Sequence, residues 1–223
     1  MRILVIDVGG TNLKISGTRV RTPVKVPSGR GMSAVGMIEA VRRATAGWAY
    51  DVVSIGYPGP VVNGRPAAEP KNLAPGWVGF DFQKALGKPV RIINDAAMQA
   101  LGGYHGARML FLGLGTGLGS ALVAEGVVVP LELAHLPYRD GKTFEDYLGI
   151  RGSKRLGRKR WRKHVAKVVA ILRHAMQAEH VLLGGGEAQR LKVLPEGARL
   201  GTNADARKGG LHLWDEARTT HAR

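Results

Sequence analysis

Two aspartates stand where a strand is expected to end, and a carboxylate at such a position can take part in chemistry. Asp7 follows an apolar run and precedes a glycine pair. There it could hold Mg²⁺ directly or through water, and its structural alternative is to cap the turn. Asp95 ends the run IIND and begins an expected helix, whose positive end favours the ionised carboxylate. For Asp95 and its neighbour Asn94 the alternative role is a helix N-cap.

Three glycine-rich turns each follow an apolar run, so their bare backbone N–H groups could converge on an anion. A hairpin is the ordinary explanation of any single one of these turns, and it is the presence of three in one short chain that favours phosphate binding. None has the spacing of a P-loop or of the dinucleotide-binding fingerprint. Beside the first turn, Lys14 offers a cation to the same anion, with a solvated lysine as the alternative. Two of these turns are the predicted phosphate turns, Gly9, Gly10 and Thr11, and Gly115, Thr116 and Gly117; the third, Gly184, Gly185 and Gly186, is a predicted cofactor-binding turn.

The turns belong to a chain in which strands and helices alternate. Apolar and alternating residues predict strands at 3–6 and 13–17 around a tight turn, and the segment 108–129 repeats this plan. A further strand runs directly into the helix expected at Asp95, and apolar residues at helical spacing predict another helix over 161–176. The pattern indicates an α/β protein with two related hairpins.

The lobe boundary is expected near the helix that begins at Asp95. This gives an N-terminal lobe, 1–95, and a C-terminal lobe, 96–223. The tail from Gly201 to Arg223 is expected to be loop and frayed terminus.

Composition limits the classes of function. With 223 residues, 44% of them hydrophobic, the chain can bury a sizeable core. No apolar run approaches the roughly eighteen residues of a membrane span, and no signal-peptide pattern is present, so we expect a cytoplasmic protein without a membrane partner. The absence of cysteine excludes disulfides, thiolate metal sites and a cysteine nucleophile. A formal net charge of +16 favours polyanionic partners such as nucleic acid, phosphorylated metabolites or polyphosphate.

Much of the positive charge lies in one segment. Residues 151–173 hold ten Lys or Arg and no acid. The ordinary explanation is a helix with a solvated basic face. The functional alternative is a track for polyphosphate, which has no base or ribose to recognise. Nucleic acid is disfavoured, because Trp161 is the only aromatic residue of the segment and base stacking needs aromatic platforms.

Seven motifs carry a family resemblance. In chain order they are DVGGTNLK, GYPGPV, KNLAPGW, INDAAMQALG, LGTGLGSAL, ELAH and LLGGG. Together they resemble the ROK-family sugar kinases of the actin/hexokinase/Hsp70 superfamily, especially the branch of polyphosphate glucokinases. The resemblance covers most of the chain.

The resemblance implies a two-lobed, actin-like ATPase fold of duplicated ribonuclease-H-like units, with sugar and phosphate donor meeting between the lobes. Asp95 would be the catalytic base, and the turn Gly184–Gly186 would approach the adenosine in ATP-using members. The family is often dimeric, so the resemblance allows a homodimer. Five polar residues match positions that bind the sugar hydroxyls: Asn72, Asn94, Glu132, His135 and Glu145.

The sequence departs from the family pattern in one loop. The usual Gly-Glu-x-Gly-His appears here as LELAH, with Leu131 and Ala134 in place of the two glycines. We therefore expect the loop that carries Glu132 and His135 to sit differently. Many family members have a cysteine-rich zinc site just after this histidine, whereas this chain lacks cysteine, so structural zinc is not expected.

These observations predict a hexokinase-type phosphotransferase of carbohydrate metabolism, a polyphosphate- or ATP-dependent glucokinase. It would use Mg²⁺ and convert glucose or a related hexose to the 6-phosphate. Phosphoryl transfer depends mainly on positioning and charge neutralisation, which glycine amides, Mg²⁺ and one carboxylate supply. The rival hypothesis is a non-catalytic polyanion- or nucleic-acid-binding protein on the same fold.

Overall fold

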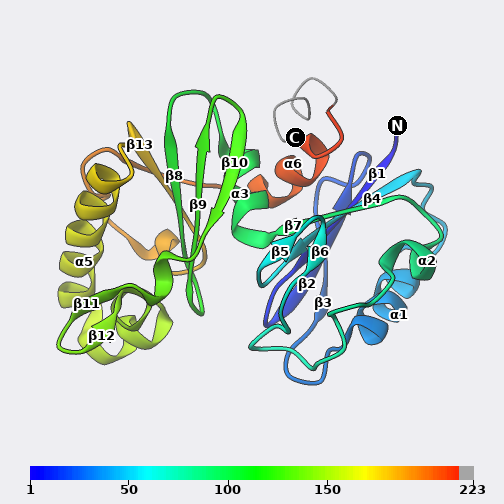
Figure 1. Cartoon of the computed structure of the whole chain (residues 1–223), viewed down its shortest axis with the longest axis horizontal. Helices are drawn as coiled ribbons and strands as arrows, with labels where there is room; N and C mark the ends of the chain where they lie inside the picture. The colour runs from blue at the N-terminus through cyan, green and yellow to red at the C-terminus, as the bar shows by residue number, and fades with distance from the viewer. Residues whose placement is uncertain (216–223) are drawn as a thin grey trace. The chain divides into compact units, whose positions relative to one another are not determined.

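The computed structural model describes residues 1–215, which form two compact units (Figure 1). The first unit contains Met1–Met98 and the segment that begins at Ala206, and the second contains Gln99–Asp205. The chain leaves the first unit inside helix α3 (Asp95–Gly103). This grouping differs from the expected lobes chiefly in the C-terminal segment, which belongs with the first unit.

The first unit is built on a five-stranded sheet of order β3-β2-β1-β4-β7. Two helices accompany the sheet, and their apolar residues join the strands in one buried cluster that includes Ile6, Met37 and Trp77. The elements are β1 (Ile3–Val8), β2 (Asn12–Gly17), β3 (Val24–Pro27), α1 (Ala34–Ala44), β4 (Val52–Tyr57), α2 (Phe82–Leu86) and β7 (Val90–Asn94), with a small hairpin of β5 (Val61–Val62) and β6 (Arg65–Pro66).

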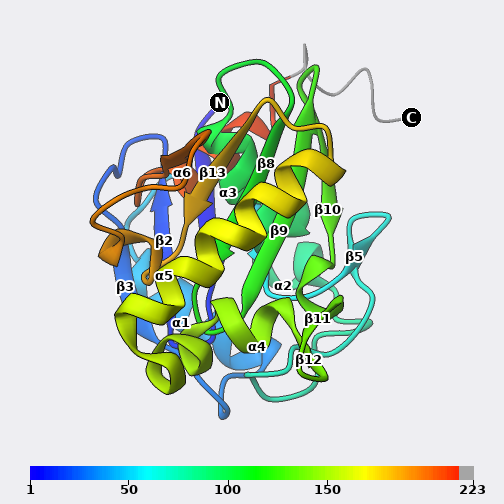
Figure 2. The same ribbon diagram turned by 90° about the vertical axis from the view of Figure 1, so that its left-hand side faces the viewer.

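The second unit is built on a five-stranded sheet of order β10-β9-β8-β13-β14. Helix α5 lies across one face of this sheet (Figure 2), where Trp161, Val165 and Val169 join the buried cluster. The elements are β8 (Met109–Leu114), β9 (Leu118–Ala124), β10 (Val127–Leu131), the 3₁₀ turn η1 (Leu133–His135), β11 (Pro137–Arg139), β12 (Lys142–Thr143), α4 (Phe144–Leu148), α5 (Ile150–Ala175), β13 (His180–Gly184), η2 (Ala188–Arg190) and β14 (Ala198–Leu200).

The two sheets have the same connectivity. In each sheet three consecutive strands pair antiparallel: β1-β2-β3 in one and β8-β9-β10 in the other. The first strand of each set also pairs in parallel with later strands, as β1-β4-β7 and β8-β13-β14. The prediction of an α/β protein with two related hairpins, β1-β2 and β8-β9, is therefore confirmed.

Helix α5 carries the basic segment and is interrupted at Gly157, whose φ of 71° and ψ of 156° lie outside the helical range. The interruption separates a short first part from a longer second part. Eight of the ten Lys and Arg residues in 151–173 are exposed, and Arg162 and Arg173 are half-buried.

The expectation that the tail from Gly201 is loop was wrong. Residues Asp205–His212 form helix α6, and 216–223 lie outside the described residues. The helix is held by contacts with distant strands: Ser54 Oγ donates to Gly210 O at 2.5 Å, and Arg207 Nε donates to Gly17 O at 2.9 Å. Among residues 1–215 no helix is long and apolar enough to cross a membrane.

Candidate active site

The predicted site residues fall into two groups, one in each unit. In the first unit, Asp7 lies near the end of β1, directly opposite Lys14 on β2. Lys14 Nζ donates to Asp7 Oδ2 at 2.9 Å, and the side chain of Asp7 is 7% exposed while that of Lys14 is 44% exposed. Lys14 is therefore not merely solvated, since it neutralises a nearly buried carboxylate beside the first glycine turn.

Asp95 is the first residue of α3, and its Oδ1 accepts a hydrogen bond from Ala96 N at 2.8 Å. Burial of the carboxyl, followed by the negative charge of Asp7, raises the pKa of Asp95 to about 7. The charge of Lys14 acts in the opposite direction. A carboxyl that titrates near neutral pH can accept a proton from a hydroxyl group at that pH.

Asn94 takes the capping role that was the structural alternative for it. Its Oδ1 accepts from Ala97 N at 3.1 Å, and its Nδ2 donates to Gly59 O at 3.1 Å. An asparagine side chain offers two N–H donors and two acceptor lone pairs, so each end keeps one hydrogen-bonding position for a ligand.

Asn72 packs against the first glycine turn. A Cβ placed on Gly10 would lie only 3.2 Å from Asn72 Cβ, which brings a predicted sugar-binding residue beside a predicted phosphate turn. Thr11 is exposed in the same turn. The loop that follows Asn72 is tied to Glu69, whose carboxylate accepts from the backbone N–H groups of Gly76, Trp77 and Val78 at 3.1 Å each. Glu69 was not predicted, because no local pattern distinguishes it.

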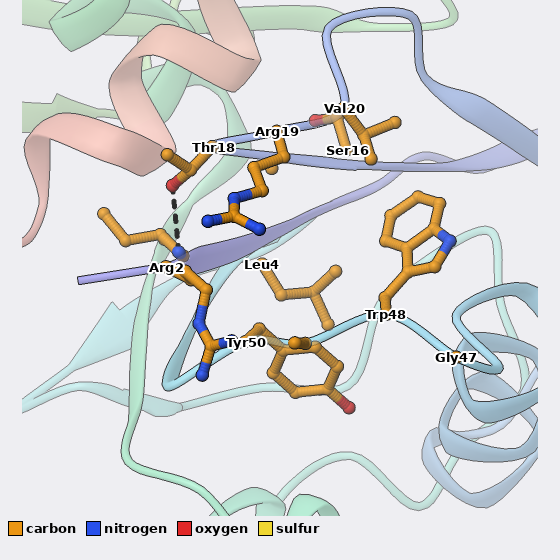
Figure 3. A pocket seen from close by; sticks show the side chains of 12 residues that line it. Arg2, Leu4, Ser16, Thr18, Arg19, Val20, Gly47, Trp48 and Tyr50 are labelled. Carbon is orange, nitrogen blue, oxygen red and sulfur yellow. Dashed lines mark hydrogen bonds between the residues drawn. The ribbon is translucent and has the colours of Figure 1, made fainter.

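A pocket of about 270 Å³ in the first unit is lined by none of the predicted site residues. It opens beside Leu4 between Arg19, Trp48 and Tyr50 (Figure 3), at the beginning of β1. Asp7 lies near the opposite end of that strand. The predicted site residues of this unit therefore lie away from this pocket.

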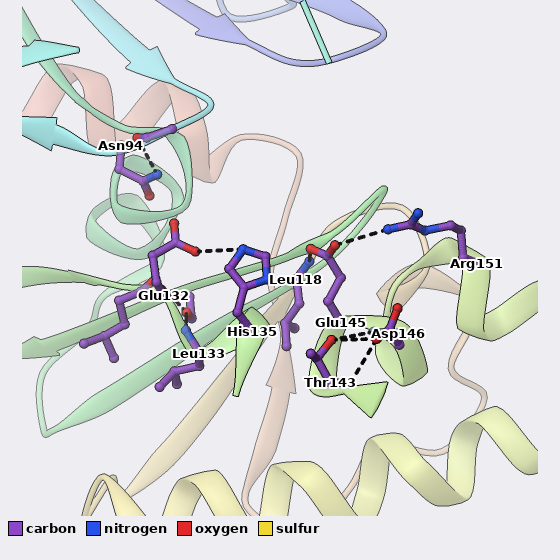
Figure 4. A network of polar contacts seen from close by, with 12 residues as sticks. Asn94, Leu118, Glu132, Leu133, His135, Thr143, Glu145, Asp146 and Arg151 are labelled. Atoms are coloured by element: carbon purple, nitrogen blue, oxygen red, sulfur yellow. Dashed lines mark hydrogen bonds and ion pairs between the residues drawn. The ribbon is translucent and has the colours of Figure 1, made fainter. Parts of the chain in front are cut away.

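In the second unit, Glu145 of α4 packs against Gly117 in the second glycine turn. Its Oε2 accepts from Leu118 N at 3.2 Å, and its Oε1 lies 3.4 Å from Arg151 Nη2 (Figure 4). A Cβ on Gly117 would overlap Glu145 Oε2, so any other residue at this position would displace the carboxylate. A predicted sugar-binding carboxylate and a predicted phosphate turn thus meet here as well.

Glu132 precedes the 3₁₀ turn η1 and His135 is its last residue, and their side chains are 64% and 52% exposed. Glu132 Oε2 lies 3.9 Å from His135 Nε2. Ser120 anchors the loop, since its Oγ donates to Leu131 O at 2.8 Å and accepts from Leu133 N at 3.2 Å.

The two residues that replace the family glycines in this loop turn toward the core. Ala134 is 3% exposed, and Leu131 packs against the buried cluster of the second unit. The substituted side chains are thereby removed from the polar surface that Glu132 and His135 present.

The third glycine turn, Gly184–Gly186, meets the end of β8, where Glu187 N donates to Leu114 O at 3.0 Å. The first residue of α5 joins the second turn, because Ile150 N donates to Gly115 O at 2.9 Å. Glu187 is 4% exposed and accepts from Ser153 Oγ at 2.8 Å. This buried carboxylate, which sequence reasoning missed, ties α5 to the third turn.

The carboxylate side chains of the site meet the needs of a Mg²⁺ ion only in part. Within the described chain, no three His, Asp or Glu side chains gather as a metal site. Asp7 and Asp95 nevertheless have interacting charges, and Mg²⁺ is commonly held by one or two carboxylates together with substrate phosphates and water. A cation held mainly by a phosphate donor is compatible with these residues.

Comparison with known proteins identifies distant relatives. No family model matches the sequence. The chain is 27% identical over 212 residues to the polyphosphate glucokinase of Mycobacterium leprae, covering 83% of this chain and 63% of that protein. It is 24% identical over 209 residues to that of Mycobacterium tuberculosis strain H37Rv, covering 83% and 77%. This chain therefore spans less than two thirds of the M. leprae protein.

Solved structures share the fold. The inorganic polyphosphate/ATP-glucomannokinase of Arthrobacter sp. strain KM matches with a TM-score of 0.74 at 22% identity, over 94% of this chain and 96% of that one. A ROK-family glucokinase of Streptomyces griseus, in complex with glucose and AMPPNP, matches with a TM-score of 0.73 at 18% identity, over 96% and 99%. The chain thus has the actin-like fold of the ROK-family sugar kinases, as its motifs predicted.

Proposed function

We propose that this protein is a sugar kinase of the ROK family, with Asp95 as its catalytic base. The observation that carries the proposal is the pKa of Asp95, raised to about 7 beside Asp7. A structural cap gains nothing from a raised pKa, whereas a general base works best when it titrates near the operating pH. The fold and the distant relatives support the assignment as a sugar kinase.

In the proposed reaction a sugar hydroxyl loses its proton to Asp95 as its oxygen attacks the terminal phosphorus of the donor. The bond from that phosphorus to the donor's bridging oxygen breaks, and the sugar 6-phosphate forms. The backbone N–H groups of the turns at Gly9 and Gly115 bind phosphate oxygens, and Lys14 balances the negative charge beside Asp7. Bound Mg²⁺, held by Asp7 and the phosphates, would neutralise charge on the donor.

The proposed sugar is glucose or a closely related hexose. A sugar is recognised by several directional hydrogen bonds, which short polar side chains provide. The side chains proposed to supply these bonds are Asn72, Asn94, Glu132, His135 and Glu145.

Polyphosphate and ATP are both proposed as donors, with polyphosphate slightly preferred. The names of the relatives from M. leprae and Arthrobacter include polyphosphate. The exposed basic residues of α5 support this choice, because the helix begins at the hydrogen bond between Ile150 N and Gly115 O and would extend countercharge from that turn. The turn Gly184–Gly186, which would approach an adenosine, keeps ATP as a donor.

A coupled assay of the purified protein tests the proposal. Glucose, mannose and other hexoses are supplied with Mg²⁺ and either ATP or polyphosphate, and sugar 6-phosphate is measured. We expect product with glucose or a close relative. Absence of product with every hexose and both donors would contradict the proposed function.

The donor preference is tested by replacing Lys159, Arg160 and Lys163 with alanine. All three are exposed on α5. The variant should raise KM for long polyphosphate far more than for ATP, and the difference should shrink as salt screens the charges beyond about 8 Å at physiological ionic strength. A matched control removes three exposed cations of the first unit, Arg43, Lys84 and Lys88. Equal effects on both donors would identify the basic face of α5 as an ordinary solvated surface.

The same basic face supports a second candidate, a non-catalytic polyanion-binding protein. This candidate predicts nucleic-acid or polyphosphate binding that persists at moderate salt, with no phosphorylation of any hexose. Gel-shift and calorimetric titrations, run beside the coupled assay, distinguish the two.

A further inference from the structure

Four ring side chains of the second unit pack together, and we call Tyr138, Phe144, Tyr147 and His164 the Tyr138 cluster. They come from three elements: β11, α4 and α5. Ring centroids are separated by 5.0 Å for Tyr138 and Tyr147, and by 4.6 Å for Tyr147 and His164. These separations lie in the range of favourable aromatic contacts. The Tyr138 cluster therefore joins the β11-β12 hairpin to both helices.

One contact in the cluster is directional. The Tyr138 hydroxyl lies 3.0 Å from His164 Nδ1. Burial, followed by the positive charge of Arg139, lowers the pKa of His164, which keeps the imidazole neutral at neutral pH. A neutral ring that carries its own proton on Nε2 can accept a hydrogen bond from the tyrosine hydroxyl at Nδ1. This bond fixes Tyr138 relative to the second part of α5.

The hairpin is also fixed at its tip. Asp140 and Gly141 both have positive φ, 52° and 66°, as in the two-residue turns that suit hairpins. The Asp140 carboxylate accepts a hydrogen bond from the Tyr147 hydroxyl at 2.9 Å. The tip is thereby tied to α4.

The base of the hairpin lies beside two predicted sugar-binding residues. Phe144 N donates to Leu136 O at 3.2 Å and closes the segment 136–144. The residues immediately outside this closure are His135 on one side and Glu145 on the other. Any rotation of the hairpin would therefore move both side chains.

We infer that the Tyr138–His164 hydrogen bond is a positioning element that sets the placement of His135 and Glu145 for the sugar. The inference rests on the proposed function, since it assigns the hairpin to the sugar site rather than to the phosphate turns. Tyr138 and His164 are positioning residues that act through the hairpin.

The test compares Tyr138→Phe, His164→Phe and the double variant with wild type. Each single change keeps a ring and removes the hydrogen bond.

We expect hexose KM to rise roughly two- to tenfold, because the net free-energy contribution of one hydrogen bond corresponds to a change of that size. The KM for the donor should stay unchanged. The double variant should be no worse than either single variant, because both remove the same contact. Tyr104→Phe is the matched control, since no hydrogen bond is seen for that hydroxyl in the described part of the unit.

Hydrogen exchange of the amides in 136–144 gives a second measurement that needs no activity. Faster exchange in Tyr138→Phe, together with the rise in hexose KM, supports the inference. Faster exchange with unchanged hexose KM overturns it and leaves only a structural role. Equal increases in the KM of hexose and donor overturn it too. If wild type binds and phosphorylates no hexose, the proposed function fails, whereas the exchange data still report whether the bond anchors the hairpin.

Discussion

Asp95 is the proposed catalytic base, and the variant Asp95→Asn tests this role. Removing the proton acceptor should lower kcat by about 10²–10⁴. The fold should persist, and circular dichroism measures this. Asp81→Asn, at the cap of α2 in the same unit, is the control for an aspartate-to-asparagine change and should keep its kcat. Wild-type kcat in Asp95→Asn would mean that Asp95 is structural.

The same variant should also change the pH dependence of stability. Asp95 has a folded pKa of about 7 against an ordinary value of 3.8, so the folded state binds the extra proton between these values. The contribution of Asp95 to wild-type stability should therefore fall as pH rises from about 4 to 7 and then level off. Above pH 7, Asp95→Asn should be the more stable protein in thermal melts, and the difference should vanish at about pH 4.

The activity profile provides an independent measurement of the same group. Because Asp95 acts as the ionised base, kcat/KM should rise with pH and reach half its plateau near pH 7. Lys14 lowers the pKa of Asp95, so Lys14→Met should move this midpoint to higher pH. An unmoved midpoint would show that another group controls the profile. Lys25→Met, an exposed lysine on β3, is the control for loss of a positive charge.

Among the loops and strands, Glu69 holds the loop of Asn72. Burial acts to raise the pKa of Glu69, but its three backbone N–H donors outweigh this and hold the pKa below its ordinary value. In Glu69→Gln an amide NH₂ replaces one of the acceptor oxygens, so a donor would face the backbone N–H donors of the loop. We expect hexose KM to rise roughly two- to tenfold.

The measurement is sugar titration of Glu69→Gln beside Glu39→Gln, an exposed glutamate of α1. Unchanged hexose affinity in Glu69→Gln would separate the Asn72 loop from sugar binding.

The elements that the sequence predicts best are those with local signals. The strands around Gly9 and Gly115 and the helix at Asp95 follow from apolar periodicity and glycine turns, and all are present. Helix α6 was missed because DARKGGLH contains two glycines and no apolar stripe, so distant contacts decide its conformation. Glu69 and Glu187 were missed for a related reason, since their partners are backbone and side-chain groups brought near only by folding.

Across the whole chain, the first unit depends on a segment distant in sequence. Ser54 is fully buried on β4, where its Oγ donates to Gly210 O and accepts from Trp214 Nε1 at 2.9 Å. Ser54→Ala leaves both groups without this partner and should destabilise the first unit by about 1–3 kcal/mol. Hydrogen exchange should quicken in β1 and β4 and stay unchanged in β8 and β13. Ser16→Ala, a buried serine on β2, is the control. Uniform acceleration in both sheets would contradict a local role for this contact.

The division of the chain at Met98 and Asp205 also has a consequence for synthesis on the ribosome. The second unit is one uninterrupted stretch, so all its residues are available once Asp205 has left the exit tunnel. The first unit is started earlier but cannot place α6 until residues 205–212 have emerged. We therefore expect the strands that are translated first to wait longest for their last partners. Ser54 and Val5, which contact Gly210, should stay uncovered in the nascent chain until α6 emerges.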